Sequence, residues 1–513
     1  MSENLTAVGR TEDEVASVPR ETSSMPASDL HSPVLDAWVR FVDAPGSPFT
    51  IPGHKQRSGR IWVDMGRVNA GDVPLLGGIA PFKDAYAFLA QSEAEAAAQF
   101  GADWCRYSTG GSTHGNQTLA LAVGQHGDRV IVSRTAHRST LLGLILAGLV
   151  PVWVPAAVDE ATGLPAGVDM HELAAAIEAN PDAVGVFLTE SSYVGSLSDL
   201  PAAVELAHQA DMPVLVDQAW GAHFGSHPAY PKHAIAAGAD AFVISGHKTL
   251  PVYSQGSIIV AKTERLDPDR LERAFDASAT TSAAGSILAS TDAGRVLLGS
   301  ELCTRLLDDL LGVVAGARTR LRAAAPFKDA VIVEPSDFGP GRFDPAKLVI
   351  LLAGTGLSGN EIEKEMIAAG LPLEMADRDA IIPIITIADD ESTVDRLCTE
   401  LIRIAEKLDA APPRDITVAG SWRSRIPVAA MTPREAFFAP HETVPAESVL
   451  NRIAAEVICP YPPGVPVVVP GEVISREVLD ALHTAQTNGV RIAYASDPTL
   501  ATFQVVRDVA SCA

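Results

Sequence analysis

Two side chains with complementary chemistry follow two apolar runs in the middle of the chain. Lys248 stands in Ser245-Gly-His-Lys-Thr-Leu, directly after Ala241-Phe-Val-Ile, and Asp217 ends the run Pro213-Val-Leu-Val-Asp. An amine can form a Schiff base with a carbonyl compound, and a carboxylate can keep a ring nitrogen protonated. Either residue alone is more often a surface group or a turn residue, so their interpretation depends on the residues that accompany them.

A cluster of glycines and hydroxyl residues supplies a third element. Thr109-Gly-Gly-Ser-Thr-His-Gly-Asn116 opens a stretch of helical composition and contains Ser112 and Thr113. Glycines permit close backbone approach, hydroxyls donate hydrogen bonds, and the first N–H groups of a helix attract a phosphate. The stretch lacks the Gly-Lys-Ser/Thr of a P-loop and the G-x-G-x-x-G of a dinucleotide site. We interpret it as a phosphate cradle of another kind.

A fourth element is His137, which follows the apolar run Arg129-Val-Ile-Val-Ser and offers a flat ring. An amine, a carboxylate, a phosphate cradle and a ring together match the needs of one cofactor, pyridoxal 5'-phosphate (PLP). The sequence therefore predicts a PLP enzyme that holds its cofactor as a Schiff base on Lys248.

Apolar runs and helical stretches alternate around these four elements. The runs begin at Val130, Pro151, Val184, Pro213, Ala241 and Gly256. They show no polar alternation, which is typical of strands buried on both faces of a mostly parallel sheet in an α/β protein. Helices are expected at Ala85–Phe100, Met170–Ile177 and Pro201–Ala210. Such sheets bind ligands beyond the carboxyl ends of their strands, where the four elements fall.

Composition divides the chain into four parts. Residues 1–30 are rich in Ser, Thr, Glu and Pro and are expected to form a disordered tail. An N-terminal segment and the PLP-binding large domain follow at 31–300, then a smaller α/β domain at 301–410. After linker-like residues 409–416 comes a C-terminal domain at 417–513. A long helix is expected from Gly294 to about Ala324, and another from Ala446 to Glu456.

The charge balance and the cysteines restrict the possible partners. The chain has 39 basic and 63 acidic residues, a net charge of −24, which opposes binding to nucleic acid or to an anionic membrane surface. Its five cysteines are scattered, which argues against a disulfide framework and against a metal site. The acidic N-terminus does not resemble a signal peptide, and there is no run of about 18 apolar residues. A small-molecule substrate and a cytoplasmic location are expected.

Longer stretches make the chain resemble the Orn/Lys/Arg decarboxylase family, the bacterial basic amino-acid decarboxylases of PLP fold type I. Matching stretches extend from Pro52-Gly-His54 to Pro470-Gly-Glu472. The distinctive ones are Gly-Ser-Thr-His-Gly-Asn (111–116), Ala-His-Arg-Ser (136–139), Asp-Gln-Ala-Trp-Gly-Ala-His-Phe (217–224), Ser-Gly-His-Lys-Thr-Leu-Pro (245–251), Thr-Pro-Arg-Glu-Ala-Phe-Phe (432–438) and Pro-Tyr-Pro-Pro-Gly-Val-Pro (460–466).

The resemblance implies a role for each matching residue. Lys248 forms the Schiff base, Asp217 pairs with the pyridine nitrogen, and His137 stacks on the ring. The residues assigned to the phosphate are Ser112, Thr113 and Ser245. Ala219 and Trp220 line the face of the cofactor. His247 lies beside the reacting carbon. The family builds its sites at a dimer interface, so the resemblance implies a homodimer or higher homo-oligomer in which 280–282 reach the neighbouring cofactor.

Two departures from the family pattern concern substrate choice and the interface. The chain reads Thr281-Ser-Ala-Ala-Gly-Ser where Thr-Ser-Pro-Ser is usual, and Pro251-Val-Tyr-Ser-Gln where Leu-Thr-Gln is usual. There is also no room before Pro52 for the receiver-like wing domain of the large acid-inducible enzymes. The chain thus resembles the compact, wingless branch, and their decamer is not implied.

The implied reaction is α-decarboxylation of arginine or lysine, ahead of ornithine, to the amine and CO2. His247 or Lys248 would return the proton. The acids considered for the cationic substrate tail are Glu374, Asp377, Glu435 and Glu472. Two other hypotheses stay open: a different PLP reaction on the same fold, such as transamination, oxidation or aldol cleavage, and a non-catalytic PLP-binding regulator.

Overall fold

The computed structural model describes residues 30–43, 71–73, 85–414, 426–461 and 465–507. The expected tail at 1–30, apart from Leu30, lies outside these ranges, as do the Pro52-Gly-His54 stretch and the end of the expected linker. No helix within the described ranges is long and apolar enough to cross a membrane.

A seven-stranded sheet forms the centre of the molecule, in the order β1-β9-β8-β7-β6-β2-β3. Its strands are β1 (Trp104–Ser108), β2 (Arg129–Ser133), β3 (Val150–Val154), β6 (Val186–Thr189), β7 (Val214–Asp217), β8 (Ala241–Ser245) and β9 (Ser257–Ala261). Neighbours from β3 to β8 pair in parallel, whereas β9 is antiparallel to β8 and β1. The mostly parallel sheet is confirmed, and each of the six apolar runs is a strand.

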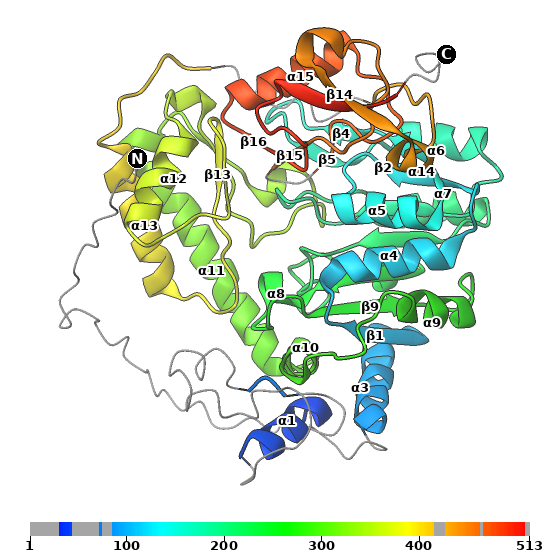
Figure 1. Ribbon diagram of the computed structural model, residues 1–513. Helices are drawn as coiled ribbons and strands as arrows, with labels where there is room; N and C mark the ends of the chain where they lie inside the picture. Colours follow the sequence, from blue (N-terminus) through cyan, green and yellow to red (C-terminus); the bar gives the residue numbers. More distant parts are fainter. Residues whose placement is uncertain (1–29, 44–70, 74–84, 415–425, 462–464, 508–513) are drawn as a thin grey trace, which may run out of the picture.

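Helices cover both faces of this sheet (Figure 1). The helices are α3 (Ala85–Phe100), α4 (Gly111–Val123), α5 (Arg138–Ala147), α6 (Met170–Ala179), α7 (Leu200–Gln209) and α9 (Pro268–Asp276). Val243 packs with Leu119 of α4 in one apolar cluster, while Phe242, the preceding residue, belongs to the cluster that includes Leu173 of α6. Successive strand residues therefore fill opposite cores, which explains the unbroken apolar runs. The three expected helices are confirmed.

The expected helix from Gly294 to about Ala324 is two helices. α10 (Gly285–Leu298) ends before Gly299, and α11 (Glu301–Ala323) begins after Ser300. The Ser300 side chain accepts a hydrogen bond from the backbone N–H of Cys303 and so caps the second helix. In Figure 1, α11 leads from α10 toward a smaller unit. At the other end of α10, α1 (Pro33–Asp43) packs against it.

The smaller unit contains a four-stranded antiparallel sheet in the order β10-β11-β13-β12. Its elements are β10 (Val331–Ile332), β11 (Ile350–Leu351), α12 (Gly359–Ala368), β12 (Met375–Ala376), β13 (Ala380–Ile382) and α13 (Glu391–Ala405).

The chain then enters a third region, at the top of Figure 1. Its elements are α14 (Pro433–Phe438), β14 (His441–Pro445), β15 (Cys459–Tyr461), α15 (Arg476–Thr487), β16 (Arg491–Ala493) and β17 (Thr502–Val506). β14 pairs with β17, and β15 with β16.

The helix expected at Ala446–Glu456 is wrong, because only Ala446–Ser448 form a short 3-10 turn. Asn451 follows with a left-handed φ of 64°, and Ala454 forms an antiparallel bridge to Val505. Backbone pairing with the neighbouring strand therefore replaces the local helix. Further along, Glu472 of this region binds Arg134, which lies just beyond β2. The C-terminal region is thereby attached to the main sheet at the carboxyl end of one of its parallel strands.

Candidate active site

One cavity of about 410 Å³ lies at the carboxyl ends of β2, β6, β7 and β8. Its lining includes all nine residues singled out from the sequence: Ser112, Thr113, His137, Asp217, Ala219, Trp220, Ser245, His247 and Lys248. They come from four different strand–helix connections, so the topology of the parallel sheet brings them together.

Lys248 lies on α8 (Gly246–Thr249), a single helical turn that follows β8. Its Nζ is 4.0 Å from the centroid of the Trp220 ring. Burial lowers the pKa of the Lys248 amine, and the carboxylates of Asp217 and Glu374 oppose that shift. A lowered pKa makes more of the neutral amine available, and only the neutral amine can attack a carbonyl carbon.

Asp217 ends β7 and is 6% exposed. Its Oδ2 accepts a 2.7 Å hydrogen bond from Nδ2 of Asn116, and its Oδ1 accepts one of 3.1 Å from the backbone N–H of Ala219. The same Asn116 nitrogen also donates to the Ser139 hydroxyl. These donors orient a buried carboxylate that faces the cavity, as a partner for a protonated ring nitrogen requires.

His137 is the N-cap residue of α5, where its ring is fixed by local hydrogen bonds. Nδ1 lies 2.8 Å from the Ser139 hydroxyl and accepts a hydrogen bond from the Ser139 N–H. Burial lowers the pKa of His137, with Lys248 and Arg138 adding to that shift and Asp217 opposing it. The lowered pKa favours the neutral ring, which is suited to stacking against a flat ligand.

The start of α4 has the features of an anion site. Its N-cap is Gly110, which has no side chain to cap the helix, and Gly111 takes a left-handed φ of 67°. The hydroxyl of Ser112, on the first turn, hydrogen-bonds the hydroxyl of Ser245 at the end of β8. An uncapped helix N-terminus with convergent hydroxyls suits a phosphate group. Together with Lys248 and Asp217, this donor set fits PLP.

The structure adds cavity residues that the sequence reasoning missed. β6 contributes its last residue, Thr189, and the loop after it contributes Ser191, Ser192 and Tyr193. The C-terminal region contributes Val465 and Tyr494. The loop comes after an apolar run, so its place at a strand end was a usable signal. Val465 lies in the stretch 460–466 that matches the family, whereas Tyr494 offered no signal, because only docking of a distant segment brings it to the site. The Tyr494 ring lies 4.1 Å from the guanidinium carbon of Arg138.

Of the four acids considered for the substrate tail, three have structural roles. Asp377 accepts hydrogen bonds from the N–H groups of Asp379 and Ala380, Glu435 closes a capping box with Thr432, and Glu472 pairs with Arg134.

The fourth acid, Glu374, does not line the Lys248 cavity but lies close enough to Lys248 and Lys347 for their charges to act on it. Partial burial raises the pKa of Glu374, and these two ammonium groups lower it.

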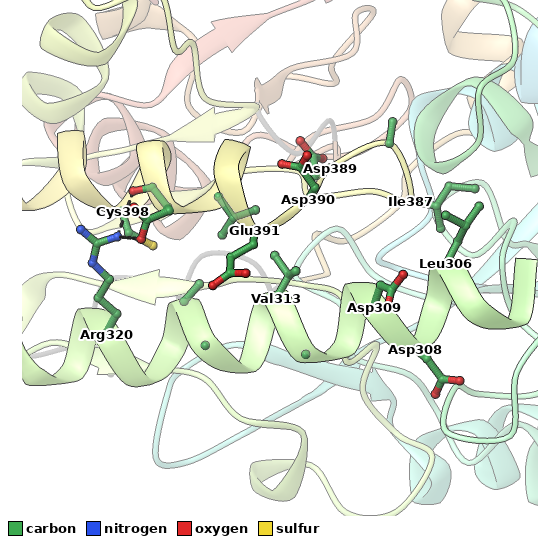
Figure 2. Close-up of a pocket in the computed structure, with 16 residues that line it drawn as sticks. Leu306, Asp308, Asp309, Val313, Arg320, Ile387, Asp389, Asp390, Glu391 and Cys398 are labelled. Atoms are coloured by element: carbon green, nitrogen blue, oxygen red, sulfur yellow. Dashed lines mark hydrogen bonds and ion pairs between the residues drawn. The ribbon is translucent and has the colours of Figure 1, made fainter. Parts of the chain in front are cut away.

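Two other cavities do not contain Lys248. Thr280, Thr281 and Ser282 line one of about 830 Å³ together with Gly110 and Gln255, which also border the Lys248 cavity. The other, of about 800 Å³, lies between α11 and α13 and is rich in carboxylates (Figure 2). There Asp390 caps α13, and Asp395 pairs with Arg320. These two acids therefore have structural roles, and the cavity is lined by none of the nine residues.

Comparisons with known proteins agree over most of the chain. Residues 32–393 match the model of the Orn/Lys/Arg decarboxylase major domain, and residues 418–491 match that of the C-terminal domain. An arginine decarboxylase of Bacillus subtilis is 31% identical over 94% of this chain and 99% of its own. The arginine decarboxylase of Bacillus anthracis is 28% identical, and the match covers 94% of this chain and 98% of that protein. The structure of lysine decarboxylase A from Pseudomonas aeruginosa superposes with a TM-score of 0.76 at 20% identity, covering 93% of this chain and 81% of that one.

Proposed function

The chain belongs to the Orn/Lys/Arg decarboxylase family, and we propose that it removes the α-carboxylate of arginine to give agmatine and CO2. Decarboxylation of a basic amino acid is the activity of the family. Arginine is favoured over lysine and ornithine because four relatives matched over 94–99% of their own length bear the name arginine decarboxylase. The observation that carries the proposal is the convergence of Lys248, Asp217 and the α4 N-terminus on one cavity.

Different residues of the cavity bind different parts of the cofactor. Lys248 provides the amine that carries it, and Asp217 keeps its ring nitrogen protonated. Ser112, Thr113 and Ser245 bind the phosphate, while His137 and Ala219 enclose the ring. When bound, PLP supplies the electron sink for the charge left at the α-carbon after CO2 departs.

The remaining polar residues of the site act on the substrate. Glu374 binds the cationic tail: it lies outside the lining of the Lys248 cavity, and of the four acids considered it is the one close enough to Lys248 for its charge to act on that amine. His247 and Lys248 are the candidates for returning a proton to the α-carbon. Nδ1 of His247 lies 3.1 Å from the carbonyl oxygen of Gly256, and burial lowers the pKa of its ring. Its other ring nitrogen stays available for proton transfer.

We propose that the active unit is a homodimer. The cavity lined by 280–282 borders the Lys248 cavity through Gly110 and Gln255, which supports an interface close to the site. Gel filtration with light scattering should give twice the mass of the chain, and a monomer that is fully active would reject this proposal.

The experiment that tests the proposed function is an amino-acid panel. Purified protein with PLP is incubated separately with arginine, lysine and ornithine, and both CO2 and the amine are measured. Arginine should give agmatine fastest. Formation of a 2-oxo acid instead of an amine would reject decarboxylation. Lys248→Ala is the matched control, and it should lose both the visible Schiff-base absorption and the CO2 release.

A further inference from the structure

A second lysine, Lys347, reaches the same aromatic ring as Lys248. Nζ of Lys347 lies 4.0 Å from the Trp220 ring centroid, the same distance as Nζ of Lys248. The two nitrogens are therefore no more than twice that distance apart. Lys347 comes from the segment between β10 and β11, 99 residues after Lys248.

Backbone contacts hold Lys347 in place beside the loop after β6. Phe343 forms an antiparallel bridge with Ser196, and the N–H of Asp344 donates to the carbonyl of Gly195 at 2.8 Å. From the other side, Arg318 of α11 donates to the carbonyl of Lys347 at 2.7 Å. A Cβ added at Gly195 would lie 2.6 Å from Cγ of Lys347, so the aliphatic stem is closely packed. The side chain thus has a fixed direction.

The ammonium of Lys347 is buried but has no anionic partner in contact. The residue is 5% exposed, and no hydrogen bond or ion pair within 4 Å joins its Nζ to a described residue, while the charges of Asp344 and Glu374 act on it from farther away. Its acidic neighbour Asp344 is already bound by His223 at 3.2 Å and by the N–H of Ala346 at 3.0 Å. A buried cation without an anion is unfavourable, so such a group is typical of a site that binds one.

Two other cations near the cavity are occupied. Arg134 forms a bidentate ion pair with Glu472, and Arg342 donates to the carbonyls of Leu197 and Ala166. Arg138 lies over the Tyr494 ring, the same kind of contact that Lys347 makes with Trp220, so Arg138 is the competing cation in the test below. Lys248 itself is consumed by the Schiff base. Among the described residues around Trp220, Lys347 is the cation that remains for a ligand.

We propose that Lys347 binds the α-carboxylate of the amino-acid substrate, an inference that rests on the proposed function. The substrate's α-nitrogen takes the place of Nζ of Lys248, so its α-carboxylate lies a few bonds from that position. Lys347 then meets the carboxylate, and Glu374 meets the cationic tail. The two charges of the site complement the two charges that the bound amino acid presents.

The arrangement separates substrate from product. Loss of CO2 removes the partner of Lys347 and leaves it beside a product that carries only positive charge. The product is therefore bound more weakly than the substrate, which favours its release.

Two stable ligands test the role of Lys347 directly. Sodium borohydride reduction of PLP with arginine or with agmatine gives phosphopyridoxyl conjugates that differ only in the α-carboxylate. The dissociation constants of both conjugates are measured by calorimetry on the full-length protein from which the cofactor has been removed. The proteins compared are wild type, Lys347→Met, Lys347→Arg and Arg138→Met. Lys347→Met should weaken the arginine conjugate by about tenfold or more and change the agmatine conjugate less than about threefold. Lys347→Arg should restore most of the difference.

The alternatives give different results. If Lys347→Met weakened the binding of both conjugates equally, Lys347 would have only a structural role and the inference would be overturned. Unchanged binding of both, or loss of the preference in Arg138→Met alone, would also overturn it. CO2 release by the wild type is scored separately: a wild type that discriminates the conjugates but releases no CO2 rejects the proposed function and leaves the carboxylate site standing.

Discussion

Nδ2 of Asn116 donates a 2.7 Å hydrogen bond to Oδ2 of Asp217. The bond joins α4, the helix that presents Ser112, to β7, the strand that ends in Asp217. One contact therefore fixes the two residues proposed for the opposite ends of the cofactor, its phosphate and its ring nitrogen.

Asp217→Asn should lower kcat by about a hundredfold or more, because an amide cannot keep the ring nitrogen protonated. Asn116→Ala leaves the carboxylate but removes one of its donors, and kcat should fall by about tenfold. Steady-state release of 14CO2 from labelled arginine measures both. A larger loss for Asn116→Ala than for Asp217→Asn would contradict the assigned roles.

Glu374→Gln should raise KM for arginine by about tenfold or more and change kcat less, since a charge-assisted contact to the substrate tail is lost. Glu374→Asp is the control that keeps the charge on a shorter side chain. The exposed capping residue Glu435, changed to Gln, provides a matched variant outside the cavity. If KM rises equally in Glu374→Gln and Glu435→Gln, Glu374 does not bind the tail.

Glu190 gives the fold a pH dependence. It is 1% exposed, its Oε1 has no hydrogen-bond partner, and burial raises its pKa to about 7, against hydrogen bonds from Ser198 and the charge of Arg342. The unfolded carboxyl, with a pKa near 4.5, loses its proton first as the pH rises. The unfolded state therefore becomes more favourable relative to the folded state between these two values, and stability falls by up to about 3 kcal/mol.

Glu190→Gln should remove this component, so that the variant is more stable than wild type at pH 8 and similar at pH 5. Urea unfolding followed by circular dichroism across that range gives the comparison. If the free energy of unfolding changed by the same amount from pH 5 to pH 8 in wild type and in Glu190→Gln, Glu190 would not be the source of the pH dependence.

Arg134 and Glu472 form a bidentate ion pair with distances of 2.7 and 2.9 Å, and both side chains are nearly fully buried. Glu472→Gln should destabilise the protein by about 3–5 kcal/mol, because the Arg134 charge is left without its partner in the interior. The double variant Arg134→Met/Glu472→Met should lose less than the sum of the two single variants. Strictly additive losses in thermal unfolding would show that the pair is not coupled.

The core of the fold and the centre of the site were predictable for the same reason. Strands buried on both faces leave unbroken apolar runs, and parallel strands place the residues beyond their carboxyl ends at one edge of the sheet. Lys248, Asp217 and His137 each lie at the end of such a run, so their proximity is a consequence of topology. The helix break at Ser300 was missed because one capping hydroxyl decides it within a stretch of otherwise helical composition.

Other parts of the site depend on contacts that local sequence does not encode. Lys347 lies in the connection between β10 and β11 of the smaller unit and reaches Trp220 only because that connection pairs with the loop after β6. Tyr494 comes from beyond β16 and enters the cavity wall through docking of the C-terminal region. The helix expected at Ala446–Glu456 failed in the same way, since a bridge to Val505 outcompetes local propensity.

The attachment of the C-terminal region through Arg134 and Glu472 also sets an order of events during biosynthesis. The ribosome completes Lys248, Asp217 and the α4 cradle long before it reaches Tyr494. A nascent or truncated chain that ends ahead of Glu472 holds its reactive amine in a cavity without its last wall. We therefore expect stable capture of the cofactor to be a late event, and truncation ahead of Glu472 to weaken it by removing Tyr494 from the cavity wall.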